Sequence, residues 1–156
     1  MARNFNDLSE QEILALAISL EETDARIYAD FAAGLKADYL ATVQIFEEME
    51  AEEDAHRRKL IEEYCRRFGE HIPLIRREDV KGFVHRKPVW MIRPLGIKTV
   101  RHQAEIMETE TRRFYERAAS KASDASTRKL LGDLAEGAKA CDLSRQSPKG
   151  IPNSGS

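Results

Sequence analysis

Apolar residues recur at helical spacing along two long stretches in the first half of the chain. The first stretch runs from about residue 9 to 36 and opens with Ser9 and Glu12, which have the spacing of a capping box. The second runs from about residue 39 to 68 and is followed by Gly69, a residue typical of helix ends. The pattern predicts two helices long enough to span a bundle.

The same periodicity returns in the second half of the chain. It runs from about residue 97 to 120 and resumes near residue 123, where Ser123 or Asp124 can cap a further helix. After Cys141 the residues are polar and small, without an apolar period, so we expect an irregular tail. The pattern therefore predicts four helices.

Residues 69–96 separate the two predicted helix pairs. Pro73, Pro88 and Pro94 forbid one continuous helix there. The segment is nevertheless too apolar for a free linker. We expect a crossover that lies along the bundle, with a short helix around residues 77–82.

Length and composition favour a single soluble domain. The 156 residues fit one domain over residues 1–141, with a tail over 142–156. The formal net charge of −2 does not indicate binding to nucleic acid or to an anionic membrane. The two cysteines form no disulfide framework, and neither an apolar run of membrane-spanning length nor a signal peptide is visible, so we expect a cytoplasmic protein.

One motif occurs in the first and the third predicted helix. Glu21 precedes Tyr28 by seven residues, and Glu108 precedes Tyr115 by the same spacing, with an arginine two residues before each tyrosine. Seven residues are close to two helical turns, so each glutamate shares a helix face with its tyrosine. Both glutamates fall within apolar stripes, where a carboxylate without a partner or a metal ion would be costly to bury.

The second predicted helix adds a Glu-x-x-His step, Glu53 and His56, which places both side chains on one face. Inward carboxylates combined with Glu-x-x-His on facing helices are the ligand set of a di-iron carboxylate bundle, and oxygen chemistry on iron needs such hard ligands. The candidate metal ligands are Glu21, Glu53, His56 and Glu108. Glu50 and Glu105 could be extra ligands, a third metal site or an entry path for iron. Tyr28 and Tyr115 could form hydrogen bonds that orient the ligands.

Plainer interpretations exist for each of these residues. Charged helix residues are usually solvated, and Glu53-x-x-His56 alone is weak evidence for a metal site. Tyr28 and Tyr115 are more typical of hydrogen-bonded core residues than of radical sites. We interpret the other histidines, Trp90 and the cysteines as structural or exposed residues rather than ligands. The in-register repeat is what favours the metal interpretation.

These motifs resemble the rubrerythrin branch of the ferritin-like superfamily over about residues 9–141. Within the predicted crossover, residues 71–77 and 86–97 resemble the erythrin domain of membrane-bound ferritins, in which a transporter domain follows. The resemblance implies an all-α, ferritin-like four-helix bundle with a long crossover between the second and third helices. It further implies a non-haem di-iron site, ferrous iron oxidation or peroxide response, and coupling to iron export at the inner membrane.

The fourth predicted helix departs from the family pattern. If Leu131 and Leu134 are aligned with the corresponding apolar residues of the second helix, the second Glu-x-x-His falls at Ala138 and Cys141, neither of which is the expected ligand. Glu136 lies two residues out of register. A frameshift or a chimeric end of the gene would explain this departure, and resequencing the gene tests that explanation.

The functional expectation is a di-iron module that oxidises ferrous iron with dioxygen or peroxide, of ferroxidase or peroxidase type if iron occupies the site. The alternative is a metal-free or metal-storing helical module that dimerises or senses. In either case we expect a homodimer, because a shortened fourth helix and an apolar crossover would leave apolar surface exposed.

Overall fold

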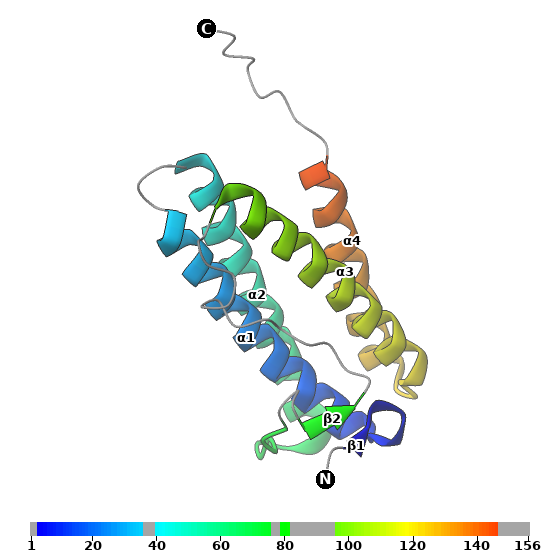
Figure 1. The fold of residues 1–156 in the computed structure, drawn as a ribbon. Coiled ribbons are helices and arrows are strands. Elements are labelled where there is room, and N and C mark those ends of the chain that lie inside the picture. The colour runs from blue at the N-terminus through cyan, green and yellow to red at the C-terminus, as the bar shows by residue number, and fades with distance from the viewer. Residues whose placement is uncertain (1–2, 36–39, 76–78, 82–95, 147–156) are drawn as a thin grey trace, which may run out of the picture. The chain divides into compact units, whose positions relative to one another are not determined.

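The computed structural model describes residues 3–35, 40–75, 79–81 and 96–146. Within these ranges the chain forms four long helices and a two-stranded corner (Figure 1). It divides into two compact units, Met1–Gln103 and Ala104–Ser156, and the boundary falls inside α3. None of the helices in the described part of the chain contains an apolar stretch of the length that a membrane crossing needs.

The first unit is built on two long helices, α1 (Glu10–Leu35) and α2 (Leu40–Phe68), which pack against each other in antiparallel directions (Figure 1). The predicted capping box of α1 is present: Ser9 Oγ accepts from the Glu12 backbone N–H at 3.2 Å, and Glu12 Oε1 accepts from the Ser9 N–H at 3.1 Å. α2 ends where predicted, because Gly69 has a φ of +87°, a conformation that favours glycine.

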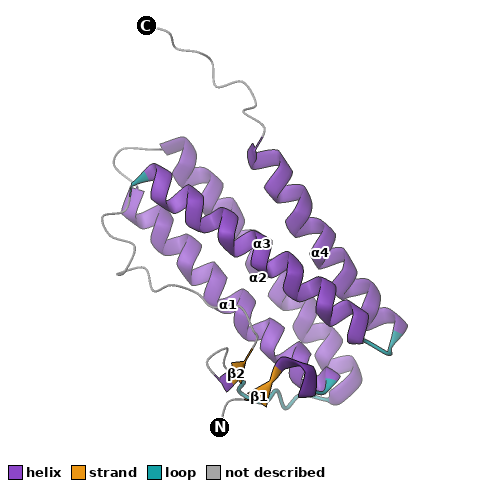
Figure 2. Ribbon diagram, turned by 45° about the vertical axis from the view of Figure 1, so that its right-hand side comes forward, coloured by secondary structure: helices purple, strands orange, loops and turns teal. Residues whose placement is uncertain are grey.

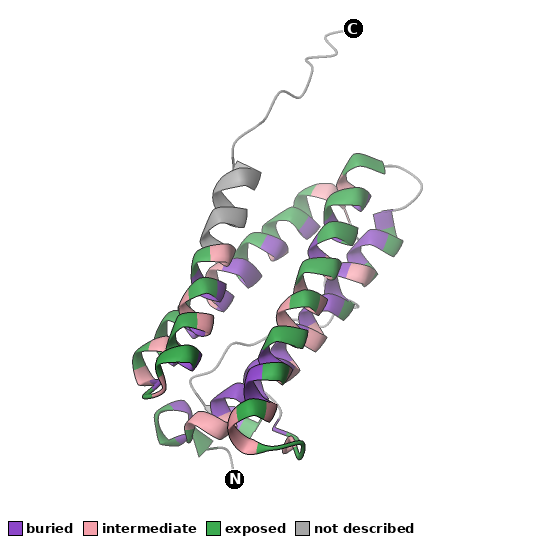
Figure 3. Cartoon of the chain, turned by 180° about the vertical axis from the view of Figure 1, so that it is seen from behind, coloured by how far each residue is buried: buried purple, intermediate pink, exposed green. Residues whose placement is uncertain are grey.

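Aromatic side chains fill the space between α1 and α2. The ring of Tyr28 stacks on that of Phe46, with centroids 6.1 Å apart, and Phe31 meets Phe46 edge-on at 5.5 Å. Leu16, Phe31 and Leu60 are fully buried. In α1, residues 13–18 are all buried, whereas the buried positions of α2 are further apart; Figure 3 colours the described residues by burial.

A small corner joins the N-terminus to the chain beyond α2. β1 (Arg3–Asn4) pairs in parallel with β2 (Val80–Lys81), and a short 3-10 helix η1 (Phe5–Asp7) follows β1 (Figure 2). The prediction of a helix around residues 77–82 is therefore wrong at Val80 and Lys81. The backbone of the extended N-terminal residues pairs with this segment, and the branched side chain of Val80 is buried at 3% exposure, which favours a strand.

Hydrogen bonds fix the chain where it leaves α2. The buried Tyr64 hydroxyl donates to the carbonyl oxygen of His71 at 2.7 Å and accepts from Gln11 Nε2 at 2.9 Å. Arg67 forms an ion pair with Glu10 at 2.9 Å. These contacts attach the C-terminal end of α2 to the N-terminal turns of α1. Most of the predicted crossover, including Trp90 and His85, lies outside the described residues.

The second unit contains most of α3 (Ile97–Lys121) and all of α4 (Ala125–Gln146). Asp124 is the cap of α4, since its Oδ1 accepts from the Thr127 N–H at 3.0 Å. α4 continues to Gln146, past Cys141, where we predicted that helical structure would end. The backbone can continue because residues 142–146 include neither proline nor glycine.

Candidate metal centre

Glu21 lies near the middle of α1 and is buried at 1% exposure. Its neighbours explain this position: the helix carries leucine, isoleucine and alanine on the face that meets α2, and Glu21 falls on that face. Glu53 and His56 lie near the middle of α2, where the buried stripe of that helix is interrupted by half-buried polar residues. The first helix pair therefore brings together a buried carboxylate, Glu21, and the half-buried side chains of Glu53 and His56.

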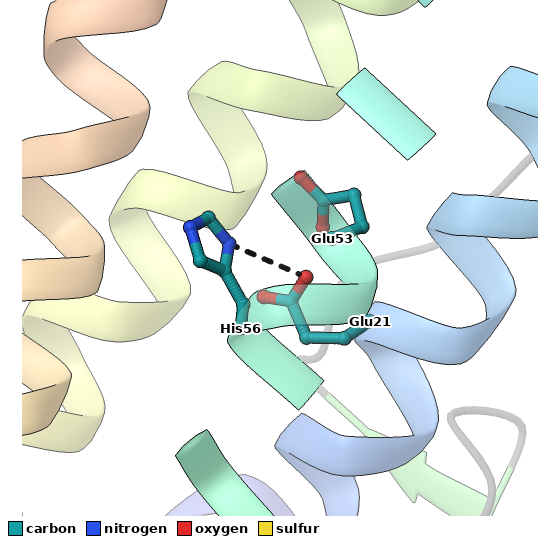
Figure 4. A group of neighbouring side chains, drawn as sticks. All are labelled: Glu21, Glu53 and His56. Carbon is teal, nitrogen blue, oxygen red and sulfur yellow. Dashed lines mark ion pairs between the residues drawn. The ribbon is translucent and has the colours of Figure 1, made fainter. Parts of the chain in front are cut away.

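These three side chains point toward one another (Figure 4). Each offers one ligand atom, and these atoms all lie within 4.8 Å of one another. His56 Nδ1 lies 3.7 Å from Glu21 Oε2. We define Glu21, Glu53 and His56 as the α1–α2 metal group.

The electrostatics of Glu53 reflect this crowding. Burial raises the pKa of its carboxyl group well above the usual value, and the charge of Glu21 and a hydrogen bond with that residue raise it further. The charge of Asp24 acts in the same direction, whereas His56 opposes it. Without a cation, Glu53 therefore holds a proton at pH values where an ordinary glutamate is ionised.

The donor set fits a metal ion. Oxygen and nitrogen ligands lie about 2.0–2.2 Å from a bound Zn²⁺ ion, so two donors of one such ion are at most about 4.4 Å apart. The 3.7 Å between His56 and Glu21 falls within that limit. Oε2 of Glu53 is buried, and no donor among the described residues reaches it. A cation between these atoms would satisfy that oxygen and offset the repulsion of the two carboxylates.

The remaining predicted ligands lie outside this group. Glu50 is half-buried on α2 and is not a member of it. On α3, Glu108 is buried at 8% exposure, whereas Glu105 is exposed to solvent. Their roles as ligands stay predictions.

The two repeated tyrosines are core residues. Tyr28 is 2% exposed and stacks on Phe46, and Tyr115 is 1% exposed with its ring 5.1 Å from that of Phe114. Their role in orienting a ligand stays a prediction.

Asp24 is a buried carboxylate to which the sequence analysis assigned no role. It is 1% exposed and follows Glu21 by three residues, so both lie on the same side of α1. The signal was present, because an aspartate in an apolar helical stripe is as unusual as the glutamate beside it.

The other candidate residues do not join the group. His71 and His102 are exposed, and Cys65 is a half-buried free thiol. On α4, Leu131 and Leu134 are buried, Glu136 is exposed and Ala138 is half-buried. The side chain of Cys141 lies outside the described residues.

Comparison with known proteins agrees with this architecture. Residues 12–139 match the family model described as Rubrerythrin. The chain belongs to the rubrerythrin family. The fold class predicted from the sequence, an all-α ferritin-like four-helix bundle, is thereby confirmed.

A crystal structure supports the same fold. It is that of an uncharacterised conserved protein from Magnetospirillum magnetotacticum, with a TM-score of 0.72 and 19% sequence identity over 92% of this chain and 98% of that one. At that identity the likeness concerns the fold alone. No curated protein matches the chain. The narrower likeness to the erythrin domain of membrane-bound ferritins is not among these matches.

Proposed function

We propose that this rubrerythrin-family chain is a non-haem di-iron carboxylate module that oxidises ferrous iron with dioxygen or peroxide. The observation that carries the proposal is the α1–α2 metal group, in which two carboxylates and an imidazole converge in a helix pair. Buried like charges are costly without a cation, and carboxylate and imidazole donors suit iron. Family membership supports a di-iron centre in a bundle of this type.

The residues have distinct roles in this proposal. Glu53 would be the carboxylate shared between the ions, His56 would be the imidazole ligand, and Glu21 and Glu108 would be further carboxylate ligands. Glu50 and Glu105 would be additional carboxylates, on an entry path. When bound, iron supplies the electron transfer between its ferrous and ferric states. The chain itself holds the ligands in place, and Glu53 releases its proton when a cation replaces it.

Anaerobic titration of the full chain with ferrous iron tests the proposal. We expect two irons per chain, followed by ferric charge-transfer absorption and catalytic oxygen uptake on exposure to air. The double variant Glu53→Ala/His56→Ala should bind iron about 100-fold more weakly or not at all, since loss of even indirect ligand contacts costs about 10–100-fold. A matched control is Glu52→Ala/Lys59→Ala, which removes two exposed residues of the same helix.

A second candidate function is a metal-storing or metal-free module that dimerises or senses. The observation that favours it is the half-buried Ala138 on α4, at the position where the family pattern has a carboxylate. Stoichiometric iron binding without catalytic oxygen uptake would indicate storage. Iron binding by the unaltered chain no stronger than that of Glu53→Ala/His56→Ala would indicate the metal-free module.

A homodimer in the cytoplasm is part of the same proposal. Leu40 and Leu74 are 75% and 82% exposed, and large apolar side chains in contact with water support a covering partner. The two cysteines, which form no disulfide pattern, suit a reducing compartment. Light scattering at several protein concentrations checks the dimer, and a monomeric mass at all of them would contradict it. Delivery of iron to a membrane transporter, implied by the erythrin-like crossover, also remains a proposal.

A further inference from the structure

Asp24 is a buried carboxylate beside the α1–α2 metal group but outside it. It lies on the side of α1 that carries Glu21, one turn further along, and its side chain is 1% exposed. The group itself, whose donor atoms lie within 4.8 Å of one another, comprises Glu21, Glu53 and His56. Asp24 is therefore adjacent to the group without being one of its ligands in this arrangement.

The charge of Asp24 reaches the group. Residues three apart on a helix are neighbours, with about 5–6 Å between their Cβ atoms, so Asp24 lies next to Glu21, and both side chains are 1% exposed. Charges in buried positions are screened less than charges in water. The negative charge of Asp24 must therefore act on any cation that Glu21 binds.

The repeat shows that helix packing does not require a charge at this position. The residue three after the glutamate is Asp24 in the first copy and Thr111 in the second. Both are buried, at 1% and 7% exposure. A neutral polar residue therefore fits the equivalent helical position, and the charge of Asp24 is a feature of the first copy alone.

We propose that Asp24 is a positioning residue of the α1–α2 metal group, whose negative charge beside Glu21 strengthens binding by a free energy that is proportional to the charge of the bound cation. This inference rests on the proposed metal-binding function. Coulomb energy scales with the product of the charges, so Asp24 contributes one and a half times as much for a trivalent ion as for a divalent ion. The residue thereby favours the higher oxidation state of a metal that changes between the two.

The variant Asp24→Asn removes the charge with little change in shape. The metal-free full chain would be titrated at one fixed pH with Mn²⁺, followed by electron paramagnetic resonance, and with Tb³⁺, followed by luminescence. We expect the affinity of Asp24→Asn for Mn²⁺ to fall about tenfold and that for Tb³⁺ about thirtyfold, because the logarithm of the change scales with ion charge. Asp30→Asn, an exposed residue of the same helix, is the matched control and should leave both affinities unchanged.

A second variant keeps the test valid if Asp24→Asn fails to fold. Asp24→Thr introduces the residue that the second copy carries at the equivalent position, and the same two titrations apply to it. Equal losses for the two ions, or no loss for either, would overturn the inference.

A different result of the same titrations would contradict the proposed metal-binding function. The unaltered chain would then bind neither Mn²⁺ nor Tb³⁺ more tightly than the variant Glu53→Ala/His56→Ala does. If the unaltered chain binds metal and the Asp24 variants bind it equally well, the metal-binding function stands and the inference about Asp24 alone is wrong.

Discussion

The motif on α1 and its repeat on α3 are alike in sequence but are followed by different helices. In the first unit the next helix, α2, brings Glu53 and His56 to Glu21. In the second unit the next helix, α4, has a half-buried alanine at position 138, where the alignment of α4 with α2 would place a glutamate equivalent to Glu53. The difference teaches that the Glu–Tyr motif alone does not gather a set of metal-ligating side chains and that the following helix must supply the other donors.

The packing around the two tyrosines also differs between the two helix pairs. Tyr28 stacks on Phe46 of the following helix, whereas α4, the helix that follows Tyr115, contains no aromatic residue. α2 contains no glycine, and α4 contains Gly132 and Gly137 in its interior. The first helix pair therefore combines aromatic contacts between its two helices with three convergent donors.

The largest expected effect comes from breaking the aromatic core of the first pair. Phe46→Ala should destabilise the protein by about 3–4 kcal/mol, because it removes a ring that contacts both Tyr28 and Phe31. Leu131→Ala, at the aligned position on α4, should cost less, about 2–3 kcal/mol. Urea unfolding followed by circular dichroism measures both, and a smaller loss for Phe46→Ala than for Leu131→Ala would contradict the comparison.

A second prediction adds to α4 the Glu-x-x-His step that α2 carries. Ala138→Glu combined with Cys141→His places a carboxylate and an imidazole three residues apart on α4, as on α2. We expect iron affinity to rise about tenfold, which corresponds to about 1.4 kcal/mol. Anaerobic calorimetric titration measures it, with Ala138→Gln/Cys141→Ser as the control. Unchanged affinity would mean that Glu108 does not share a site with these positions.

A third prediction concerns the pH dependence of the metal-free protein. Because the pKa of Glu53 is raised in the folded state, the folded chain keeps a proton that the unfolded chain loses as pH rises. Stability is therefore highest below the unfolded pKa of the carboxyl group and decreases as pH rises through the folded pKa. Glu53→Gln should remove this decrease and stabilise the apo protein by about 1 kcal/mol at neutral pH.

Thermal unfolding between pH 4 and 8, in the presence of a chelator, measures this effect. Glu52→Gln, at an exposed position next to Glu53, is the control and should keep the slope of the unaltered chain. A steeper loss of stability with pH in Glu53→Gln than in the unaltered protein would refute the electrostatic interpretation of the group.

The smallest expected effect concerns the glycines of α4. A Cβ atom added at Gly132 or Gly137 meets nothing within 4 Å, so alanine should fit at both positions. Each substitution should stabilise the helix by about 0.5–1 kcal/mol. Gly69→Ala should have the opposite sign, because φ is +87° there. Thermal melts of the three single variants check this, and destabilisation by Gly132→Ala would show that α4 needs a close approach at that point.

Local sequence signals predicted much of the fold. The capping box at Ser9 and the glycine at position 69 place the ends of α1 and α2 closely, since both signals depend on neighbouring residues alone. The pairing of β1 with β2 could not be predicted, because strands of two residues have no periodicity. The continuation of α4 to Gln146 was also missed, because polar residues without an apolar stripe resemble an irregular tail.

Helical spacing made part of the candidate site predictable. Helical spacing determines which residues share a face, and this placed Glu53 and His56 on one side of α2. Spacing does not determine which neighbour lies opposite a face, so the sequence could not show whether Glu50, Glu105 and Glu108 meet the same group. Asp24 belongs to no motif, so the only signal at this position is an acidic residue within an apolar stripe.

The pairing of Arg3–Asn4 with Val80–Lys81 joins two segments that are distant in sequence, and it encloses the whole α1–α2 hairpin. Strands this short hold few hydrogen bonds, so this closure can open without unfolding the hairpin. Backbone amides at the N-terminus should therefore exchange with deuterium sooner than those in the middle of α1. The carboxylates of the first helix pair are thus held by the more slowly exchanging part of the molecule.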